Sequence, residues 1–176
     1  KCQITASSSF FVPKPFTPFQ WAPMCTAEEY MRRASIVKQA FSEQLNRKSL
    51  KYHWHDAQVT VLEGVLARGD RKVGNVIEKA YRLGALFDSW TETFRGECWM
   101  QAFADTGVDP EFYTLRERGE DELFPWDFID IGVQKEFLRK EWNRALAETV
   151  TPNCRIQCCG CGAARYGGGV CYEGKN

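Results

Sequence analysis

Apolar residues recur at helical spacing in six stretches of the chain. The first begins with the capping box Thr26-x-x-Glu29, so we expect an amphipathic helix of about 20 residues that ends near Arg47. Asp, Gly and Pro mark where most of the others start or stop. These helices are expected at 56–69, 70–84, 96–105, 111–117 and 133–148. Inward positions are expected at Tyr30, Ala34, Val37, Phe41 and Leu45, at Val73, Val76, Ile77 and Ala80, and at Leu138, Trp142, Ala145 and Leu146.

Two short segments favour β-strands, at 3–12 and at 50–54. The first leads into a loop with Pro13, Pro15, Pro18 and Pro23, whose fixed φ angles make it rigid and extended. The loop also carries Phe16, Phe19 and Trp21. A strand, a helix, a strand and then several helices are typical of the last units of an α/β layer followed by a helical extension. Two strands are too few to close a sheet.

Composition excludes several classes of protein. The 176 residues suit one domain or a large piece of a longer protein, and we expect the latter, since Lys1 begins the chain without a targeting peptide. With 23 basic and 23 acidic residues, the charge disfavours nucleic acid as a partner. No apolar run reaches the roughly 18 residues of a membrane span. The expected location is cytoplasmic.

The cysteines carry the strongest chemical signal. Five of the eight lie in the last 26 residues, at Cys154, Cys158, Cys159, Cys161 and Cys171, among many glycines. Four thiolates make a closed tetrahedral zinc site or hold an iron–sulfur cluster, and glycines let the backbone fold tightly around it. We expect Cys154, Cys158, Cys161 and Cys171 to be the ligands, with zinc slightly favoured. Cys159 is then a spare thiol or an alternative ligand.

Other chemistry is weakly indicated. His53 and His55, the two histidines, sit two apart, so on a strand they face the same side as ligands or proton carriers, although packing or capping explains them equally well. Arg68-Gly69-Asp70 resembles an adhesion tripeptide but lies where one helix stops and the next is capped. Nucleotide-binding glycine motifs and the nucleophile elbow of hydrolases are absent from the sequence.

The sequence resembles the C-terminal part of radical S-adenosylmethionine proteins, in the bacterial subgroup whose full chains also carry a cobalamin-binding-like domain. The resemblance rests on four blocks: Phe11–Trp21, Leu62–Arg71, Phe87–Trp90 and Trp126–Val133. The first is the most specific, because many such enzymes end a late barrel strand with a Pro-rich, Thr-Pro-containing loop that lines the active-site mouth. The family pattern has a His where Phe16 stands.

The resemblance implies an α/β, mostly helical fold that supplies the last strand and helix units of a partial TIM-type barrel. Residues 1–69 would end the barrel, 70–150 would form a helical extension, and 151–176 the metal-binding tail. S-adenosylmethionine and a four-iron four-sulfur cluster would be bound by an upstream barrel that this chain lacks, so that the chain alone is inactive. Phe11, Val12 and Pro13 would contribute to cofactor binding at the mouth. The substrate is not implied.

Two other functions fit the same residues. A non-enzymatic zinc knuckle would bind RNA or a protein partner, using Arg155, Arg165, Tyr166 and Lys175. A redox tail would cycle the adjacent thiols of Cys158 and Cys159 and hold no stoichiometric metal. The cysteine spacing of three and two also occurs in the cluster motif of radical enzymes, but there a whole barrel follows the motif, and only 15 residues follow Cys161.

Overall fold

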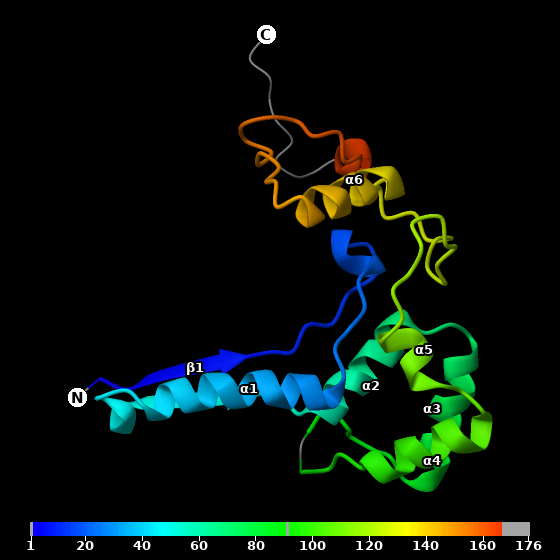
Figure 1. The fold of residues 1–176 in the computed structure, drawn as a ribbon. Helices are drawn as coiled ribbons and strands as arrows, with labels where there is room; N and C mark the ends of the chain where they lie inside the picture. Colours follow the sequence, from blue (N-terminus) through cyan, green and yellow to red (C-terminus); the bar gives the residue numbers. More distant parts are fainter. Residues whose placement is uncertain (1, 91, 167–176) are drawn as a thin grey trace. The chain divides into compact units, whose positions relative to one another are not determined.

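The computed structural model describes residues 2–90 and 92–166. In that part the chain is α/β and mostly helical, as expected (Figure 1). The strands are β1 (Ile4–Ser8) and β2 (Leu50–Trp54), and the helices are α1 (Ala27–Ser42), α2 (Ala57–Arg68), α3 (Lys72–Leu83), α4 (Gly96–Thr106), α5 (Pro110–Thr114) and α6 (Lys135–Leu146). Short 3-10 turns lie at Pro18–Trp21, Arg47–Ser49 and Ala163–Tyr166.

The chain divides into two compact units. Unit 1 combines Lys1–Val12 with Pro23–Arg116, and unit 2 combines Pro13–Ala22 with Glu117–Asn176. Unit 1 therefore holds both strands and helices α1 to α5, while unit 2 holds the Pro-rich loop, α6 and the described part of the cysteine-rich tail. The boundaries at 69 and 150 that we expect from the sequence stay a prediction.

In unit 1 the two strands pair in parallel, with Ile4 opposite Leu50 and Ser8 opposite Trp54. Helix α1 connects them and packs against β2, where the Phe41 ring lies 5.5 Å from the Tyr52 ring. Thr26 caps α1 through the N–H of Glu29, as the capping box predicts. Parallel strands need such a crossover connection, which is the unit from which α/β sheets are built.

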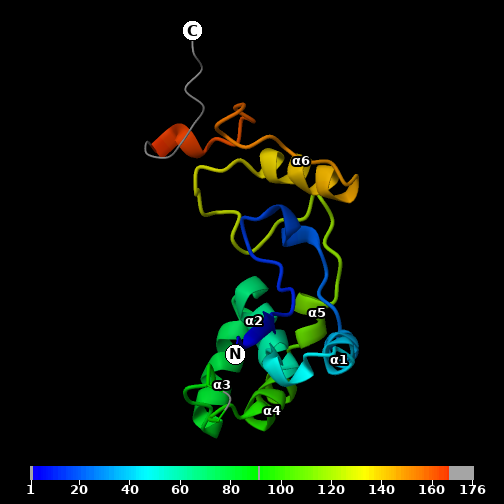
Figure 2. The ribbon, with the colours of Figure 1, turned by 90° about the vertical axis from the view of Figure 1, so that its left-hand side faces the viewer.

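The rest of unit 1 is a helical cluster, in which Figures 1 and 2 show α2 to α5 gathered around one core. Asp56 caps α2 and Asp109 caps α5, each by accepting hydrogen bonds from backbone N–H groups two or three residues ahead. Gly84, with φ of 100°, ends α3 in the left-handed conformation that glycine adopts without strain. Buried members of the core include Leu62, Val65, Val73, Val76, Ala80, Trp99, Ala102, Phe103 and Tyr113.

Unit 2 packs around aromatic side chains. Its core combines the Pro-rich loop, the segment before α6 and one face of α6. The buried residues are Trp21, Ala22, Phe124, Trp126, Leu138 and Trp142. The Arg118 guanidinium lies 5.3 Å from the Trp126 ring and contributes a cation–π contact. Trp21 of the Pro-rich segment is thus buried in this core, and Phe16 packs against it.

All six helices and both strands are confirmed in type, but several boundaries and inward positions are wrong. Helix α1 ends at Ser42, since residues 43–49 turn the chain back toward β2, and this leaves Leu45 fully exposed at 102%. Val37, Ile77 and Leu146 are also exposed, because the buried stripes of α1, α3 and α6 are narrower than the apolar pattern. None of the described helices is both long and apolar enough to cross a membrane.

Candidate functional site

The described part of the tail forms a tight loop that holds three of the four expected metal ligands. We call residues 153–163 the cysteine loop. It starts with a turn in which the Asn153 side chain accepts a hydrogen bond from the N–H of Arg155, at 2.9 Å. Cys154 and Cys158 are exposed, and Cys161 is half-buried. All three are free thiols.

The end of the loop presents a backbone donor to a sulfur atom. The N–H of Ala163 donates to Sγ of Cys161 over 3.4 Å. Gly160 and Gly162, with φ of 71° and 90°, make this fold possible, because left-handed backbone disfavours any other residue. Hydrogen bonds to sulfur stabilise negative charge on a thiolate and tune the metal it binds. The geometry at Cys161 therefore fits a ligating thiolate.

The cysteine loop is anchored within unit 2 just before α6. The N–H of Gln134 donates to the carbonyl of Cys161 at 3.0 Å. Gly162 lies so close to this segment that a Cβ atom there would be 2.5 Å from the carbonyl oxygen of Gly132. Arg165 adds an ion pair to Asp130 at 2.7 Å. Cys161 is thus held in place by contacts that need no metal.

The four expected ligands are not assembled in the described residues. Cys171 lies outside the described residues, and no group of three or more metal-ligating side chains occurs within them. Cys159 is set apart from its neighbour, since its thiol faces the carbonyl oxygens of Pro152 and Gln157 at 3.5 and 3.7 Å. This contact favours the spare-thiol interpretation of Cys159. The four-cysteine site stays a prediction.

The residues expected to bind a cofactor at the mouth lie after β1. Phe11 is half-exposed, and its carbonyl accepts a hydrogen bond from the Tyr30 hydroxyl at 2.6 Å in unit 1. Val12 is half-buried, also in unit 1, whereas Pro13 is fully buried in unit 2. Phe16 adopts a left-handed φ of 58°, which is strained for a bulky residue.

A residue that the sequence analysis missed organises this loop. Gln20 is buried, and its side-chain oxygen accepts hydrogen bonds from the N–H of Phe16 at 3.1 Å and from Nε1 of Trp126 at 2.9 Å. These bonds fix the strained turn at Phe16. In the sequence, only the polar character of Gln20 between Phe19 and Trp21 sets this residue apart.

Two weaker candidates have ordinary positions. His53 and His55 are both exposed, one on β2 and one just after it. Arg68 is fully buried, while Asp70 accepts hydrogen bonds from the Tyr113 hydroxyl and the N–H of Lys72. The Arg68-Gly69-Asp70 tripeptide thus marks the end of α2 and the start of α3, as expected, and is not displayed for adhesion.

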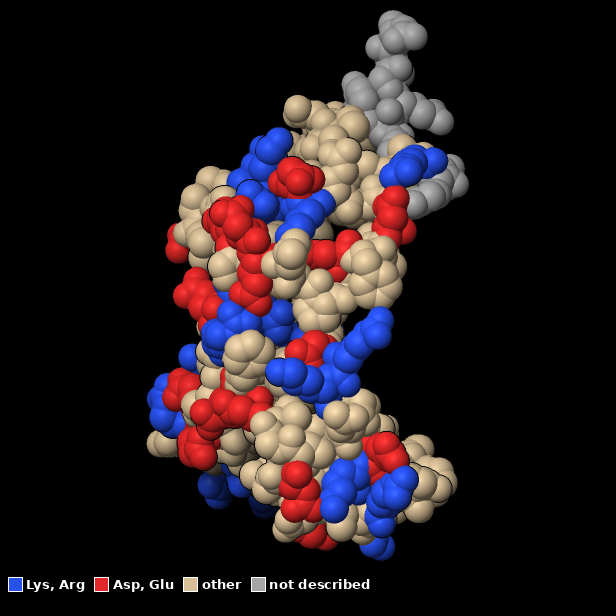
Figure 3. Space-filling view, turned by 90° about the vertical axis from the view of Figure 1, so that its right-hand side faces the viewer, with Lys and Arg blue, Asp and Glu red and all other residues tan. Residues whose placement is uncertain are grey.

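On the face shown in Figure 3, basic and acidic side chains are interspersed.

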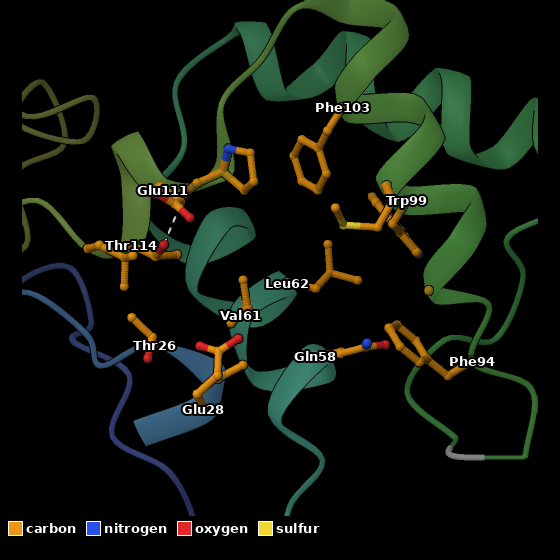
Figure 4. Close-up of a pocket in the computed structure, with 15 residues that line it drawn as sticks. Thr26, Glu28, Gln58, Val61, Leu62, Phe94, Trp99, Phe103, Glu111 and Thr114 are labelled. Carbon is orange, nitrogen blue, oxygen red and sulfur yellow. Dashed lines mark hydrogen bonds between the residues drawn. The ribbon is translucent and has the colours of Figure 1, made fainter. Parts of the chain in front are cut away.

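Unit 1 also contains a cavity that the sequence does not signal. It lies among α2, α4, α5 and the start of α1, and has a volume of about 260 Å³ (Figure 4). Apolar side chains, including Leu62 and Trp99, form much of its wall, and two glutamates, Glu28 and Glu111, stand at its edge.

No protein-family model, no curated protein and no solved structure matches this chain.

Proposed function

We propose that this chain is the C-terminal segment of a radical S-adenosylmethionine enzyme, in which it shapes the active-site mouth and carries a zinc or auxiliary iron–sulfur site in its tail. One observation carries the proposal more than any other. The parallel β1–β2 sheet is covered on one face only and is open on the other.

The two faces of this sheet differ in chemistry. Tyr52 and Trp54 are half-buried toward α1, where the ammonium of Lys38 lies 5.5 Å from the Trp54 ring. The opposite face is exposed and mostly polar, and consists of Thr5, Ser7, Lys51 and His53. Two parallel strands are not stable alone, and parallel sheets are normally covered on both faces. In an open barrel with a ligand-filled interior, the late strands would be covered by helices on the outside and would carry polar side chains on the inside.

Along the chain, the Pro-rich loop follows the strand end from which the mouth of a barrel would be built. It begins after the carboxyl end of β1, and active sites of TIM-type barrels lie at the carboxyl ends of their strands. The strained turn at Phe16, fixed by Gln20, adds support because such strain gathers at functional sites. Here the chain's own residues would orient and enclose the substrate, while the upstream barrel would supply S-adenosylmethionine and its cluster.

In the tail, Cys154, Cys158, Cys161 and Cys171 would hold the metal. Thiolates suit zinc and iron–sulfur clusters alike, and the bond from Ala163 to Cys161 would stabilise one thiolate whichever metal is bound. Zinc would fold the tail, whereas a cluster would carry electrons. The backbone of Cys161 is anchored while Cys154 and Cys158 are exposed, which fits a site that closes when metal arrives.

Metal analysis of anaerobically purified protein tests the tail site. We expect about one zinc per chain, or iron with sulfide and a brown colour, and loss of the metal in the variant Cys158→Ser plus Cys161→Ser. Cys159→Ser is the matched control, because this neighbouring thiol faces backbone carbonyls, and it should keep the metal. Wild-type protein without stoichiometric metal would contradict the tail site and support the thiol-exchange alternative.

Cleavage of S-adenosylmethionine tests the enzyme assignment. The full-length protein, reduced under anaerobic conditions, should release 5′-deoxyadenosine and methionine, and this chain alone should release neither. A folded full-length protein that binds no iron and leaves S-adenosylmethionine intact would contradict the assignment. Salt-dependent RNA binding by the chain would instead support the zinc-knuckle alternative.

A further inference from the structure

The cavity in unit 1 is half-open and has an apolar side and an acidic side. In Figure 4, Phe94, Trp99 and Phe103 stand on one side, and Glu28 and Glu111 stand on the other. The volume of about 260 Å³ is just below the roughly 300 Å³ at which pockets for drug-sized ligands begin. The cavity therefore suits a small ligand with one flat apolar part.

The charge of the lining has one sign. Its fifteen residues include two carboxylates and no lysine or arginine. Neither Glu28 nor Glu111 makes an ion pair with any described residue, although Glu29, next to the first of them, pairs with both Arg32 and Arg33. Glutamate is favourable in the first turn of a helix, which explains each residue separately. This preference does not explain why two such helix starts border one cavity whose lining contains no basic side chain.

One uncharged polar group in the wall is also available. The Gln58 side chain makes no hydrogen bond to the described residues and points toward Phe94 in Figure 4. Gly96 leaves room for it, since a Cβ there would meet the Gln58 side-chain oxygen at 2.8 Å. Trp99 contributes its apolar ring to the wall, since its indole N–H is buried. The Gln58 side-chain oxygen is an acceptor that can orient the donor group of a ligand.

We infer that this cavity binds a small organic cation, an ammonium group on an aromatic or aliphatic body. The ammonium lies between the carboxylates of Glu28 and Glu111, and the body packs against Trp99 and Phe103. The carboxylates attract the ammonium and the aromatic wall takes up the apolar body, so the two sides of the cavity favour the two ends of one ligand. An anion of equal size is repelled by the two carboxylates. The site is independent of the tail and of the proposed enzyme activity.

Binding of 2-phenylethylamine to the full chain tests the inference, with 2-phenylethanol and phenylacetate as neutral and anionic probes of similar shape. Nitrogen-edited NMR follows the indole N–H of Trp99 during each titration. The amine should shift this signal saturably and bind about tenfold tighter than the alcohol, and phenylacetate should not bind. Equal binding of all three probes, or no shift of the Trp99 signal with amine, would overturn the inference.

The variant Glu28→Gln plus Glu111→Gln separates the carboxylates from the apolar wall. It should weaken amine binding about tenfold and leave binding of the alcohol unchanged. Glu136→Gln is the matched control, because Glu136 is an exposed first-turn glutamate of α6 in unit 2. Both variants should keep the wild-type circular dichroism. Unchanged amine affinity in the folded double variant would contradict a site built on these carboxylates.

Discussion

Trp126 donates its indole N–H to the side-chain oxygen of Gln20 over 2.9 Å, across 106 positions of sequence. The bond is buried, and the same oxygen also accepts the N–H of Phe16. One amide thus ties the Pro-rich loop to the segment before α6 and fixes the left-handed backbone at Phe16. Unit 2 is therefore held together by this polar group as well as by its aromatic core.

Replacing Gln20 should destabilise unit 2. Gln20→Leu leaves the indole N–H of Trp126 buried without an acceptor, and we expect a loss of about 2 kcal/mol in the free energy of unfolding. Denaturant unfolding followed by tryptophan fluorescence measures it. In the Trp126→Phe background the donor is gone, so Gln20→Leu should cost clearly less there. Equal costs in both backgrounds would contradict the role given to this bond.

Replacing Gly64 by alanine should destabilise unit 1 for steric reasons. A Cβ at this position of α2 would lie 2.3 Å from Sδ of Met24 and 3.1 Å from Cγ2 of Thr114. Gly64→Ala should therefore cost about 1–3 kcal/mol of overpacking, against a gain in helix propensity of at most about 1 kcal/mol. Gly74→Ala in α3 is the control, because nothing lies within 4 Å, and it should stabilise the chain. Thermal unfolding compares the two, and a stabilising Gly64→Ala would refute the contact.

Glu29 should make α1 sensitive to acid. Hydrogen bonds from Arg32 and Arg33 lower the pKa of the Glu29 carboxyl from 4.5 to about 2. A lowered pKa in the folded state means that the stabilisation is complete above pH 4.5 and is lost as the pH falls toward 2. Stability and helicity should therefore decline less between pH 4.5 and 2 in Glu29→Gln than in wild type. Glu28→Gln, which removes an unpaired neighbour, serves as control; identical pH profiles for wild type and Glu29→Gln would count against the ion pairs.

Local sequence patterns predicted the type of each helix and strand, but they did not predict the long-range contacts. The capping box at Thr26, the caps at Asp56 and Asp109 and the glycine at Gly84 act within a few residues, so their helices could be identified from the sequence. Trp126 and Phe128 lie two residues apart and are both aromatic, yet Trp126 is buried and Phe128 is 86% exposed. Only tertiary contacts, such as the bond of Trp126 to Gln20, decide between them.

The candidate sites follow the same division. Cysteine spacing points to the tail, because metal ligands close together in sequence are held by local backbone geometry, as at Cys161 and Ala163. The cavity bordered by Glu28 and Glu111 has no such signature, since its walls come from α1, α2, α4 and α5. Residues that meet only through packing leave no spacing in the sequence. The four polar residues of the open sheet face likewise emerge only from the strand register.

Replacing Gly162 should weaken the retention of metal in the tail. Its φ of 90° and its approach to the carbonyl of Gly132 both oppose a side chain. Gly162→Ala should therefore displace the cysteine loop and weaken zinc binding about tenfold, measured by competition with a chelator. Gly160→Ala is the matched control, since Gly160 also has a positive φ but nothing within 4 Å, and its effect should be smaller. Equal effects would show that the contact with Gly132 does not support the site.

X-ray absorption at the zinc edge of the zinc-loaded chain tests the central claim most directly, because it identifies the ligand atoms. Four cysteine thiolates predict a first shell of four sulfur atoms at about 2.3 Å. Cys158→Ser plus Cys161→Ser should abolish that shell, and Cys159→Ser should preserve it. A first shell dominated by nitrogen or oxygen at about 2.0–2.1 Å, or a wild-type chain that does not retain zinc, would contradict a thiolate metal site in the tail.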